Sequence, residues 1–306
     1  MTPTVRPLRP ADTAAVAGVL AAAAPYQVIS AGWLDWHTVA APAAEHFGVL
    51  VAESDGRVVG AALTGLLHES ADPGLAFANV TVHPDRRGRG AGAALAAAAE
   101  RRLAALGARV AYAKVAEDPA STAFAERHGY RRGRRAEHLG LDLAGADLPE
   151  PPPPPPGVRL LAATALADPY PLYRADLDAS RDEPGEATMD EISYADWRTA
   201  YWDRPDLDRQ LTTLAMVDAT VVSFTVALTD GRERYRSGMT GTRRSHRGRG
   251  LAGLVKLAAL RQAREAGFRY AMTSNDAGNE AMRAINHRLG YRLVGAEWRY
   301  HRDLDG

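Results

Sequence analysis

Apolar and polar residues along the first half of the chain alternate in short runs or recur at helical spacing. Alternation predicts strands, and helical spacing predicts helices. In chain order we expect a strand near Val5–Leu8, a helix from about Asp12, a hairpin of Gly48–Glu53 and Val58–Leu66, a strand at Ala76–Val82, a helix of about four turns, a strand at Arg109–Val115, a helix at Pro119–His128 and two final strands. The Asp12 side chain is expected to cap the first helix. This order is typical of an α/β fold, a mixed sheet flanked by helices.

The second half repeats this plan. Arg87-Gly88-Arg89-Gly90-Ala91-Gly92 has a counterpart 160 residues later in Arg247-Gly248-Arg249-Gly250-Leu251-Ala252. A second hairpin, Leu211–Val217 with Thr220–Leu228, matches the first. Between the copies, the six consecutive prolines Pro151–Pro156 predict a stiff polyproline II spacer. We therefore expect a tandem duplication with an N-terminal domain at 1–145, a linker at 146–157 and a C-terminal domain at 158–306.

The composition excludes several classes of function. The 37 basic and 37 acidic residues cancel, which argues against bulk binding of nucleic acid or an anionic membrane. The chain has no cysteine, so disulfides, thiolate metal sites and a catalytic thiol are excluded. His, Asp and Glu show no metal-ligand spacing, and we expect no metal. Without a bilayer-length apolar stretch or a secretory h-region, we expect a cytoplasmic protein that is a monomer or a homodimer.

The two glycine-rich turns are candidate anion sites. Each is expected to join a strand to a helix N-terminus, where free backbone N–H groups and the helix dipole attract a phosphate. Glycine allows the backbone to approach such a ligand closely, and the neighbouring arginines add charge-assisted hydrogen bonds. The spacing fits neither the dinucleotide-binding fingerprint nor a P-loop. It fits Arg-x-x-Gly-x-Gly/Ala, at Arg87 to Gly92 and again at Arg247 to Ala252.

This pattern, after the fourth strand of each unit, resembles the pyrophosphate loop of the GCN5-related N-acetyltransferases (GNAT). The resemblance implies two tandem GNAT-type acyltransferase domains and acetyl-CoA as cosubstrate. In that family the strand before the loop also binds the pantetheine arm through its backbone. The implied cofactor-binding residues in the first half are Val80, Thr81, Val82, Arg87, Gly88, Arg89, Gly90, Ala91, Gly92 and Ser121. Those in the second half are Thr240, Gly241, Thr242, Arg247, Gly248, Arg249, Gly250, Leu251, Ala252, Asn275, Asn279 and Asn286.

The resemblance also implies where catalytic residues lie. Asn279 and Asn286 are seven residues apart on one predicted helix face, so both can point at a ligand, although capping a turn or facing solvent is the alternative. Many family members have a Tyr acid at the position of Asn286. An amide releases no proton near neutral pH, so Asn286 is expected to orient the leaving thiolate. Tyr291, Tyr300 or a water is then left as the acid. Mycothiol synthases share the tandem plan, but this absent Tyr leaves them as distant relatives.

The acceptor site is expected before the second hairpin. The segment from Asp168 to Asp208 contains twelve acidic residues and only four arginines, with six Tyr and Trp residues among them. Carboxylates with aromatic rings suit a cationic amine, while a solvated acidic helix pair with its aromatics in the core is the alternative. The predicted function is N-acetylation of a small, cationic amine by direct transfer, with the second half active. The alternatives are a non-catalytic acyl-CoA sensor and an enzyme that acylates a hydroxyl.

Overall fold

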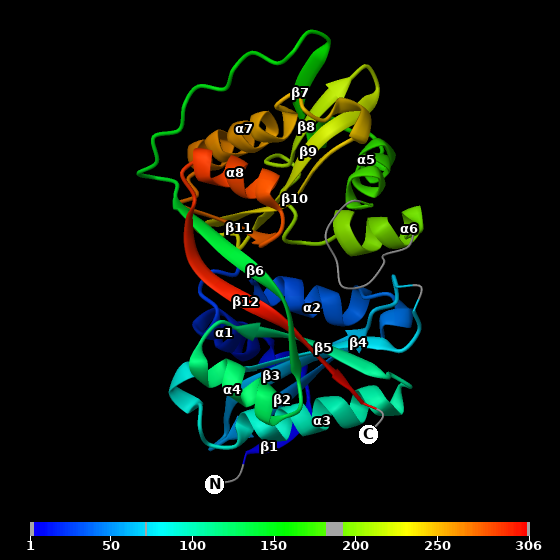
Figure 1. The fold of residues 1–306 in the computed structure, drawn as a ribbon, viewed down its shortest axis with the longest axis vertical. Helices are drawn as coiled ribbons and strands as arrows, with labels where there is room; N and C mark the ends of the chain where they lie inside the picture. Colours follow the sequence, from blue (N-terminus) through cyan, green and yellow to red (C-terminus); the bar gives the residue numbers. More distant parts are fainter. Residues whose placement is uncertain (1–2, 71, 182–191, 305–306) are drawn as a thin grey trace. The chain divides into compact units, whose positions relative to one another are not determined.

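The computed structural model describes residues 3–70, 72–181 and 192–304 of the chain (Figure 1). These residues form two units, of which unit 1 contains the described part of 1–136 with 295–304. Unit 2 contains 137–181 and 192–294. Both have strands of mixed direction covered by helices, which confirms the predicted α/β class. Among the described helices, none has the length and apolar character needed to cross a membrane.

Unit 1 has the predicted order of elements with one additional helix. Its strands are β1 (Thr4–Pro7), β2 (Gly48–Ser54), β3 (Arg57–Leu66), β4 (Leu75–Val82) and β5 (Val110–Ala116). Its helices are α1 (Thr13–Ala23), α2 (Ala31–Ala40), α3 (Ala91–Ala105) and α4 (Pro119–Arg127), with 3-10 turns η1 (Pro10–Asp12), η2 (Ala43–Glu45) and η3 (Pro84–Arg86). The sequence patterns did not predict α2, which Ser30 caps by accepting a hydrogen bond from Trp33 N.

The predicted capping role of Asp12 is wrong. Its carboxylate makes no hydrogen bond to the start of α1. Instead it accepts two hydrogen bonds from Arg6, at 2.6 and 3.0 Å, and one from Arg9 N at 2.8 Å. The guanidinium of Arg6 is the main cause that lowers the pKa of Asp12 to about 2. Asp12 therefore ties the first strand to the turn before α1.

Unit 2 repeats the plan. Its strands are β7 (Val158–Ala162), β8 (Thr213–Val217), β9 (Thr220–Thr229), β10 (Arg234–Thr242) and β11 (Tyr270–Asp276). Its helices are α5 (Tyr170–Ser180), α6 (Tyr194–Trp197), the π-helical turn η5 (Arg198–Trp202), α7 (Leu251–Glu265) and α8 (Glu280–Arg288), with 3-10 turns η4 (Ala163–Ala165) and η6 (Arg244–His246). In both units the fourth and fifth strands are parallel and the earlier neighbours are antiparallel.

The last strand of each half is one long strand, so the prediction of two final strands was wrong. These strands are β6 (Arg131–Asp142) and β12 (Arg292–Asp303). Residues 297–303 of β12 pair antiparallel with β5 and belong to unit 1, whereas residues 137–142 of β6 belong to unit 2, where β6 neighbours β11. The units therefore exchange their last strands, and each contains residues from both sides of the linker.

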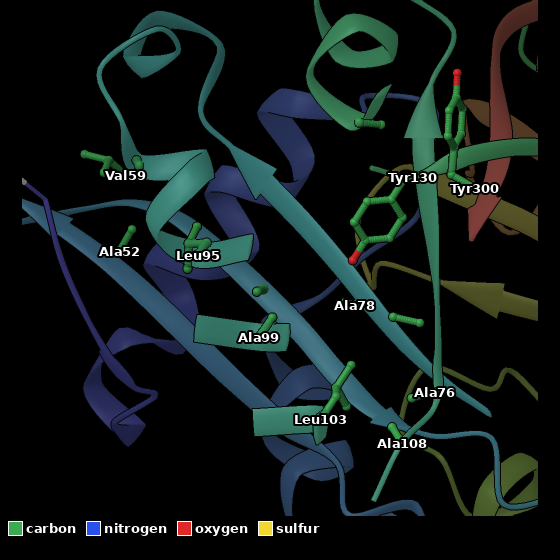
Figure 2. Packing of buried hydrophobic residues seen from close by; sticks show 14 residues of the cluster. Ala52, Val59, Ala76, Ala78, Leu95, Ala99, Leu103, Ala108, Tyr130 and Tyr300 are labelled. Atoms are coloured by element: carbon green, nitrogen blue, oxygen red, sulfur yellow. The ribbon is translucent and has the colours of Figure 1, made fainter. Parts of the chain in front are cut away.

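Helices cover each sheet because its side chains alternate between two faces. In unit 1, Leu95, Ala99 and Leu103 recur every fourth residue on α3 and are buried in the core with Tyr300, from the exchanged end of β12 (Figure 2). In unit 2, Leu214 and Met216 of β8 pack with α5, while Ala215 between them packs with α7. Thus α5 and α7 cover opposite faces of the unit 2 sheet.

The proline-rich segment lies within unit 2, between β6 and β7. Residues 151–155 have no regular secondary structure, and most of the six prolines are exposed. On its N-terminal side, Arg261 of α7 donates hydrogen bonds to the carbonyls of Leu148 and Pro149, and Arg264 donates one to that of Ala146. The C-terminal turns of α7 therefore hold the start of the linker.

Candidate functional site

The fourth strand of unit 2 carries a β-bulge that its counterpart in unit 1 lacks. The register of β10 against β9 shifts between Ser237 and Thr240, which leaves Gly238 and Met239 without a partner residue. The pairing of β4 with β3 is regular over its whole length. Before the bulge, β10 and β4 correspond at an offset of 159 residues, because Arg236 pairs with Met272 and Phe77 pairs with the equivalent Tyr112. After the bulge the offset is 160, since Thr242 corresponds to Val82. Unit 2 has therefore gained one residue here.

The same strand separates from its parallel neighbour. Pairing of β10 with β11 ends at Arg236 and Met272, although both strands continue. In unit 1 the pairing of β4 with β5 ends at Phe77 and Tyr112. There the Asn79 side chain accepts a hydrogen bond from Lys114 N at 2.9 Å and so bridges the two strands. The corresponding gap in unit 2 borders a cavity.

A cavity of about 360 Å³ lies in unit 2. Its wall includes the bulge, the facing ends of β9 and β11, the helices α5 and η5, and one residue of α7. The lining residues are Leu172, Asp176, Ser180, Trp197, Tyr201, Trp202, Arg204, Leu207, Phe224, Val226, Leu228, Arg236, Ser237, Gly238, Met239, Thr240, Lys256, Thr273, Ser274, Asn275, Asn279 and Met282. Because α5 and α7 cover opposite faces of the sheet, the cavity passes through it where β10 and β11 separate.

Aromatic rings and one carboxylate form the α5 side of the cavity. Asp176 accepts a hydrogen bond from the indole Nε1 of Trp197 at 2.7 Å, and Ser180 Oγ is 3.5 Å from the same carboxylate. Trp197 and Trp202 are buried, while Tyr201 is partly exposed beside them. Among the described residues, Asp176 is the only acid that lines the cavity. This side offers one negative charge within a largely apolar wall.

Of the described acids in the acidic segment, only Asp176 lines the cavity. Asp182, Glu183, Glu186, Asp190 and Glu191 lie outside the described residues. The described acids have structural partners. Asp168 accepts a hydrogen bond from Tyr194, Asp178 one from Arg244 N at 2.9 Å, and Asp206 two from Arg204. These three described acids therefore help to hold the fold and are not free to bind an acceptor.

Three cationic residues also line the cavity. Arg204 is balanced by its two hydrogen bonds to Asp206, at 2.7 and 2.8 Å. Arg236 donates a hydrogen bond to Ser274 Oγ at 3.2 Å. Lys256, on α7, is only 1% exposed, and its Nζ lies 5.7 Å from the ring centroid of Tyr291. Burial lowers the pKa of the Lys256 amine from 10.5 to about 7.

The sequence analysis missed Lys256. The chain has only two lysines, Lys114 and Lys256, and uses arginine for every other cation apart from histidine. Lys256 lies between Val255 and Leu257 in an apolar helix that follows the second glycine-rich turn. At an offset of 160 the first half has Ala96. A rare residue type in an apolar context was a signal, but nothing in the sequence shows that the side chain reaches a cavity.

A buried polar cluster lies below the bulge. Ser237 Oγ donates a hydrogen bond to Tyr235 Oη at 3.3 Å and is 3.4 Å from Tyr291 Oη, while Thr273 Oγ1 donates to the Ser237 carbonyl at 3.1 Å. Tyr235 and Tyr291 are fully buried, and burial raises the pKa of both, that of Tyr235 to about 12. Tyr291 is a core residue that does not line the cavity, so its position does not suit the catalytic role expected from the sequence.

The three asparagines occupy different positions. Asn279 lines the cavity and caps α8 by accepting a hydrogen bond from Met282 N at 3.2 Å. Asn286 is fully buried outside the cavity wall, and its Nδ2 donates to Asn275 Oδ1 at 2.6 Å. Asn275 lines the cavity. Asn286 therefore holds Asn275 in place and is a positioning residue in this arrangement.

Both glycine-rich turns have the same geometry. Gly88 and Gly90 have φ of 73° and 86°, and Gly248 and Gly250 both have φ of 74°, values that disfavour any other residue. The turns from Arg87 to Gly90 and from Arg247 to Gly250 are exposed, and α3 and α7 begin directly after them. No side chain caps either helix start. The first backbone N–H groups of α3 and α7 therefore have no side-chain cap among the described residues.

The other residues expected to bind the cofactor lie at the cavity, in packed strands or at the starts of helices. Thr240 lines the cavity, whereas Gly241 is packed so closely that a Cβ there would lie 2.6 Å from Ala179 of α5. Ser121 donates a hydrogen bond from Oγ to Asp118 at 2.7 Å and forms the start of α4. The strand residues Val80, Thr81 and Val82 are half-buried on β4. The helix starts Ala91, Gly92, Leu251 and Ala252 follow the two turns.

Tyr300 belongs to unit 1. Its hydroxyl accepts a hydrogen bond from Arg132 Nε at 2.9 Å and donates one to Glu126 at 3.1 Å. Among the residues that the structure describes, no group of three or more His, Asp or Glu side chains is arranged to hold a metal ion.

The chain is similar to known acetyltransferases. Residues 21–130 match the family model described as the acetyltransferase (GNAT) family. A mycothiol acetyltransferase from Nocardia farcinica is 32% identical over 245 residues, 79% of this chain and 78% of that protein. A second, from Nocardiopsis dassonvillei, is 29% identical over 273 residues, 82% of this chain and 80% of that protein. These relatives are nearer than position 286 alone indicated.

Solved structures match the whole chain. A tandem GNAT protein from the clavulanic acid biosynthesis pathway, solved without acetyl-CoA, has a TM-score of 0.76 at 26% identity and covers 99% of both chains. A GCN5-related N-acetyltransferase from Sphaerobacter thermophilus has a TM-score of 0.73 at 21% identity, with 99% of this chain and 96% of that chain covered. The tandem fold expected from the sequence repeat is thereby confirmed.

Proposed function

The chain is an acetyltransferase of the GNAT family, and on that premise we propose that unit 2 transfers an acetyl group from acetyl-CoA to a small amine held in the cavity. The observation that carries the proposal is the bulged strand β10, which lines a cavity and then leads into the glycine-rich turn of unit 2.

Acetyl-CoA fits the stretch from the turn to the cavity. The pyrophosphate binds the uncapped N-terminus of α7 with Arg247 and Arg249 beside it, because backbone N–H groups and cations both stabilise phosphate charge. The pantetheine arm follows β10 back from Thr242 towards Thr240, which lines the cavity. The thioester then reaches the gap between β10 and β11.

The bulge supplies the group that polarises the thioester. Gly238 and Met239 line the cavity and have no partner in the β9 register. A backbone N–H that is not used in the sheet can donate to the carbonyl oxygen as negative charge develops on it. Asn275, held by Asn286, is a second donor on the opposite strand, since its Nδ2 is not needed for the bond between the two side chains.

The acceptor amine binds on the α5 side. Asp176 provides a carboxylate, and Trp197, Tyr201 and Trp202 provide ring faces and edges that suit an organic cation. This is a narrower basis for a cationic acceptor than the acidic segment in the sequence, because a single acid lines the cavity. Arg204 and Arg236 at the same cavity suit an acceptor that also bears an acidic or hydroxyl group.

Unit 2 is the proposed site because unit 1 differs from it in four respects. Its β4 has no bulge, and Asn79 bridges β4 to the backbone of β5. Ala125 and Ala96 stand where unit 2 has Asn286 and Lys256. Unit 1 keeps the glycine-rich turn, and its match to the family model covers that turn. We propose that unit 1 binds CoA without transferring the acetyl group.

Calorimetry and a thiol-release assay test the proposal. Titration with acetyl-CoA measures binding, and release of the CoA thiol is then followed over a panel of amines and alcohols. The panel includes the acceptor of the mycothiol acetyltransferase relatives. Turnover with amines and not with alcohols is the expected result. Binding without turnover on any acceptor supports a sensor instead, turnover with alcohols alone supports O-acylation, and no binding overturns the proposal.

A further inference from the structure

Lys256 is a buried amine that reaches the cavity from the opposite face of the sheet. It projects from α7, whose other buried side chains form the core, and it lines the cavity together with the bulge and with Asn275. Among the described residues, no Asp or Glu forms an ion pair with it. A lysine that is 1% exposed and has no ion-pair partner loses hydration without compensation. Burial of such a residue lowers the stability of the fold, so a function at the cavity would explain its presence.

We propose that Lys256 is the proton-transfer residue of the acetyl transfer: it takes a proton from the attacking amine nitrogen and delivers that proton to the CoA sulfur. The inference rests on the proposed function of unit 2. It addresses the acid that the sequence leaves open, since Asn286 has no proton to give and Tyr291 is in the core.

The reaction balances with Lys256 alone. The acceptor first releases its ammonium proton to water. The neutral nitrogen then attacks the thioester carbon, the C–N bond forms, and the carbonyl electron pair moves to oxygen. Neutral Lys256 Nζ then removes one proton from the cationic nitrogen of the intermediate. The oxygen pair re-forms the C=O bond, the C–S bond breaks with its electrons on sulfur, and the Lys256 ammonium protonates the thiolate. The products are the amide, the CoA thiol and neutral Lys256, so no other reactant is needed.

The acidity of Lys256 suits both steps. With the pKa of its amine lowered to about 7 by burial, a large share of Lys256 is neutral at neutral pH and can accept a proton. Its ammonium is then a stronger acid than an alkyl thiol, whose pKa is about 8.5, so protonation of the thiolate is favourable. A lysine with the ordinary pKa of 10.5 would be almost fully protonated before the reaction and a weaker acid than the thiol after it.

The other titratable groups around Lys256 do not replace it. The cavity is also lined by Asp176 of α5, Tyr201 of η5, Arg204 and Arg236 of β10. Arginine remains protonated near neutral pH, and Asp176 already accepts a hydrogen bond from the Trp197 indole N–H. Tyr291, whose ring lies near Lys256, and Tyr235 are buried, have raised pKa values and keep their protons. Burial is the cause of the lowered pKa of Lys256, and no carboxylate of the described residues opposes it.

The titration of Lys256 can be measured without any activity assay. In a sample with ¹³Cε-labelled lysine the chain gives two lysine signals, which Lys114→Arg assigns. Lys114 is exposed on β5 and serves as the internal reference. We expect a midpoint near 7 for Lys256. A Lys256 midpoint above about 9 overturns the inference, because the protonated amine would accept nothing.

Kinetics test the role itself. Lys256→Met should lower kcat by at least 100-fold, the low end for general acid–base catalysis, and Lys256→Arg should do the same because arginine keeps its proton. KM for acetyl-CoA should stay within about threefold because no binding contact is removed. Lys114→Met is the matched control and should keep wild-type kcat. The thermal midpoint of each variant reports folding, and removal of a buried amine should not lower it.

A change of leaving group distinguishes proton transfer from packing. When the donor is an acetyl thioester of an aromatic thiol, the leaving thiolate is stable without a proton. The kcat of Lys256→Met should therefore fall by less than about tenfold with this donor. If Lys256→Met loses the same factor in kcat with both donors, or keeps a kcat within threefold of wild type, the inference is overturned while the proposed function stands. If the unsubstituted protein acetylates no amine, the proposed function and the inference both fail, whatever the titration shows.

Discussion

Replacement of Gly250 by Val should abolish turnover, whereas the same change at Gly90 should not. Both glycines have positive φ, 74° and 86°, and each precedes the first residue of the helix after its glycine-rich turn. At both positions no protein atom lies within 4 Å of an added Cβ. The pair is therefore matched in backbone strain and in local packing, and differs in the unit that it affects.

The expected size of the effect follows from the backbone. A side chain in the left-handed region costs roughly 1–2 kcal/mol, and more for a β-branched residue. At about 2–4 °C per kcal/mol, each variant should lose several degrees of thermal midpoint. The strained turn of Gly250→Val should no longer present two backbone N–H groups to the pyrophosphate. A hydrogen bond to a charged group contributes about 1.5–3 kcal/mol, so the binding free energy of acetyl-CoA should weaken by about 3 kcal/mol or more. That corresponds to at least about 100-fold weaker use of acetyl-CoA.

Steady-state kinetics and differential scanning fluorimetry measure both effects on the same samples. We expect kcat/KM for acetyl-CoA to fall at least 100-fold in Gly250→Val and to stay within about threefold in Gly90→Val, with similar thermal shifts in the two. The reasoning is refuted if Gly90→Val is the variant that loses turnover, since the active unit would then be unit 1. Equal losses in both would show that the two units act together.

Three further outcomes follow from the structure. Deletion of Met239 makes β10 the same length as β4 and should lower kcat by about 100-fold or more in a folded protein, as removal of an oxyanion donor does; retained kcat would exclude the bulge from catalysis. Asn286→Ala should release Asn275 and lower kcat about 10- to 100-fold with little change in KM for acetyl-CoA, and an unchanged kcat would leave Asn286 a purely structural residue. The pKa of Asp12 is lowered from 3.8 to about 2 by Arg6, so its stabilisation is present above pH 3.8 and is lost as the pH falls towards 2. The difference in thermal midpoint between wild type and Asp12→Asn should therefore be largest above pH 5 and shrink on acidification, and a constant difference would contradict it.

Local features of the fold could be predicted because local residues determine them. The turns at Gly88 to Gly90 and at Gly248 to Gly250 have the positive φ values that only glycine adopts readily, so the sequence marks where each helix begins. The hairpin predicted at Ser54 to Arg57 is formed by β2 and β3, with Asp55 and Gly56 at positive φ. The bulge was not predicted, because the one-residue change of offset within β10 is seen only in the pairing of the strands.

The exchange of β6 and β12 could not be read from the sequence. Both strands follow a helix and a Gly-Tyr pair, and either one satisfies the hydrogen-bonding edge of β5 or β11. The choice of partner depends on contacts between residues far apart in the chain, such as Glu297 with Ala116. Local periodicity carries no information about such a choice.

The chemistry of the site was predicted in part. The sequence singled out Asn275 and Asn279, which line the cavity, and Tyr291, which the structure buries in the core. Residue type alone does not distinguish a tyrosine in a core from one at a ligand. Lys256 is the reverse case. A lysine in a sequence is ordinarily expected at the surface, but here it lines a cavity where β10 and β11 separate.

A crystal structure with CoA bound tests the central claim most directly. The account predicts CoA sulfur in the cavity of unit 2, between β10 and β11 and beside Gly238 and Met239, with the pyrophosphate at the start of α7. CoA bound in unit 1 alone, with its sulfur between β4 and β5 and the cavity of unit 2 empty, would contradict it.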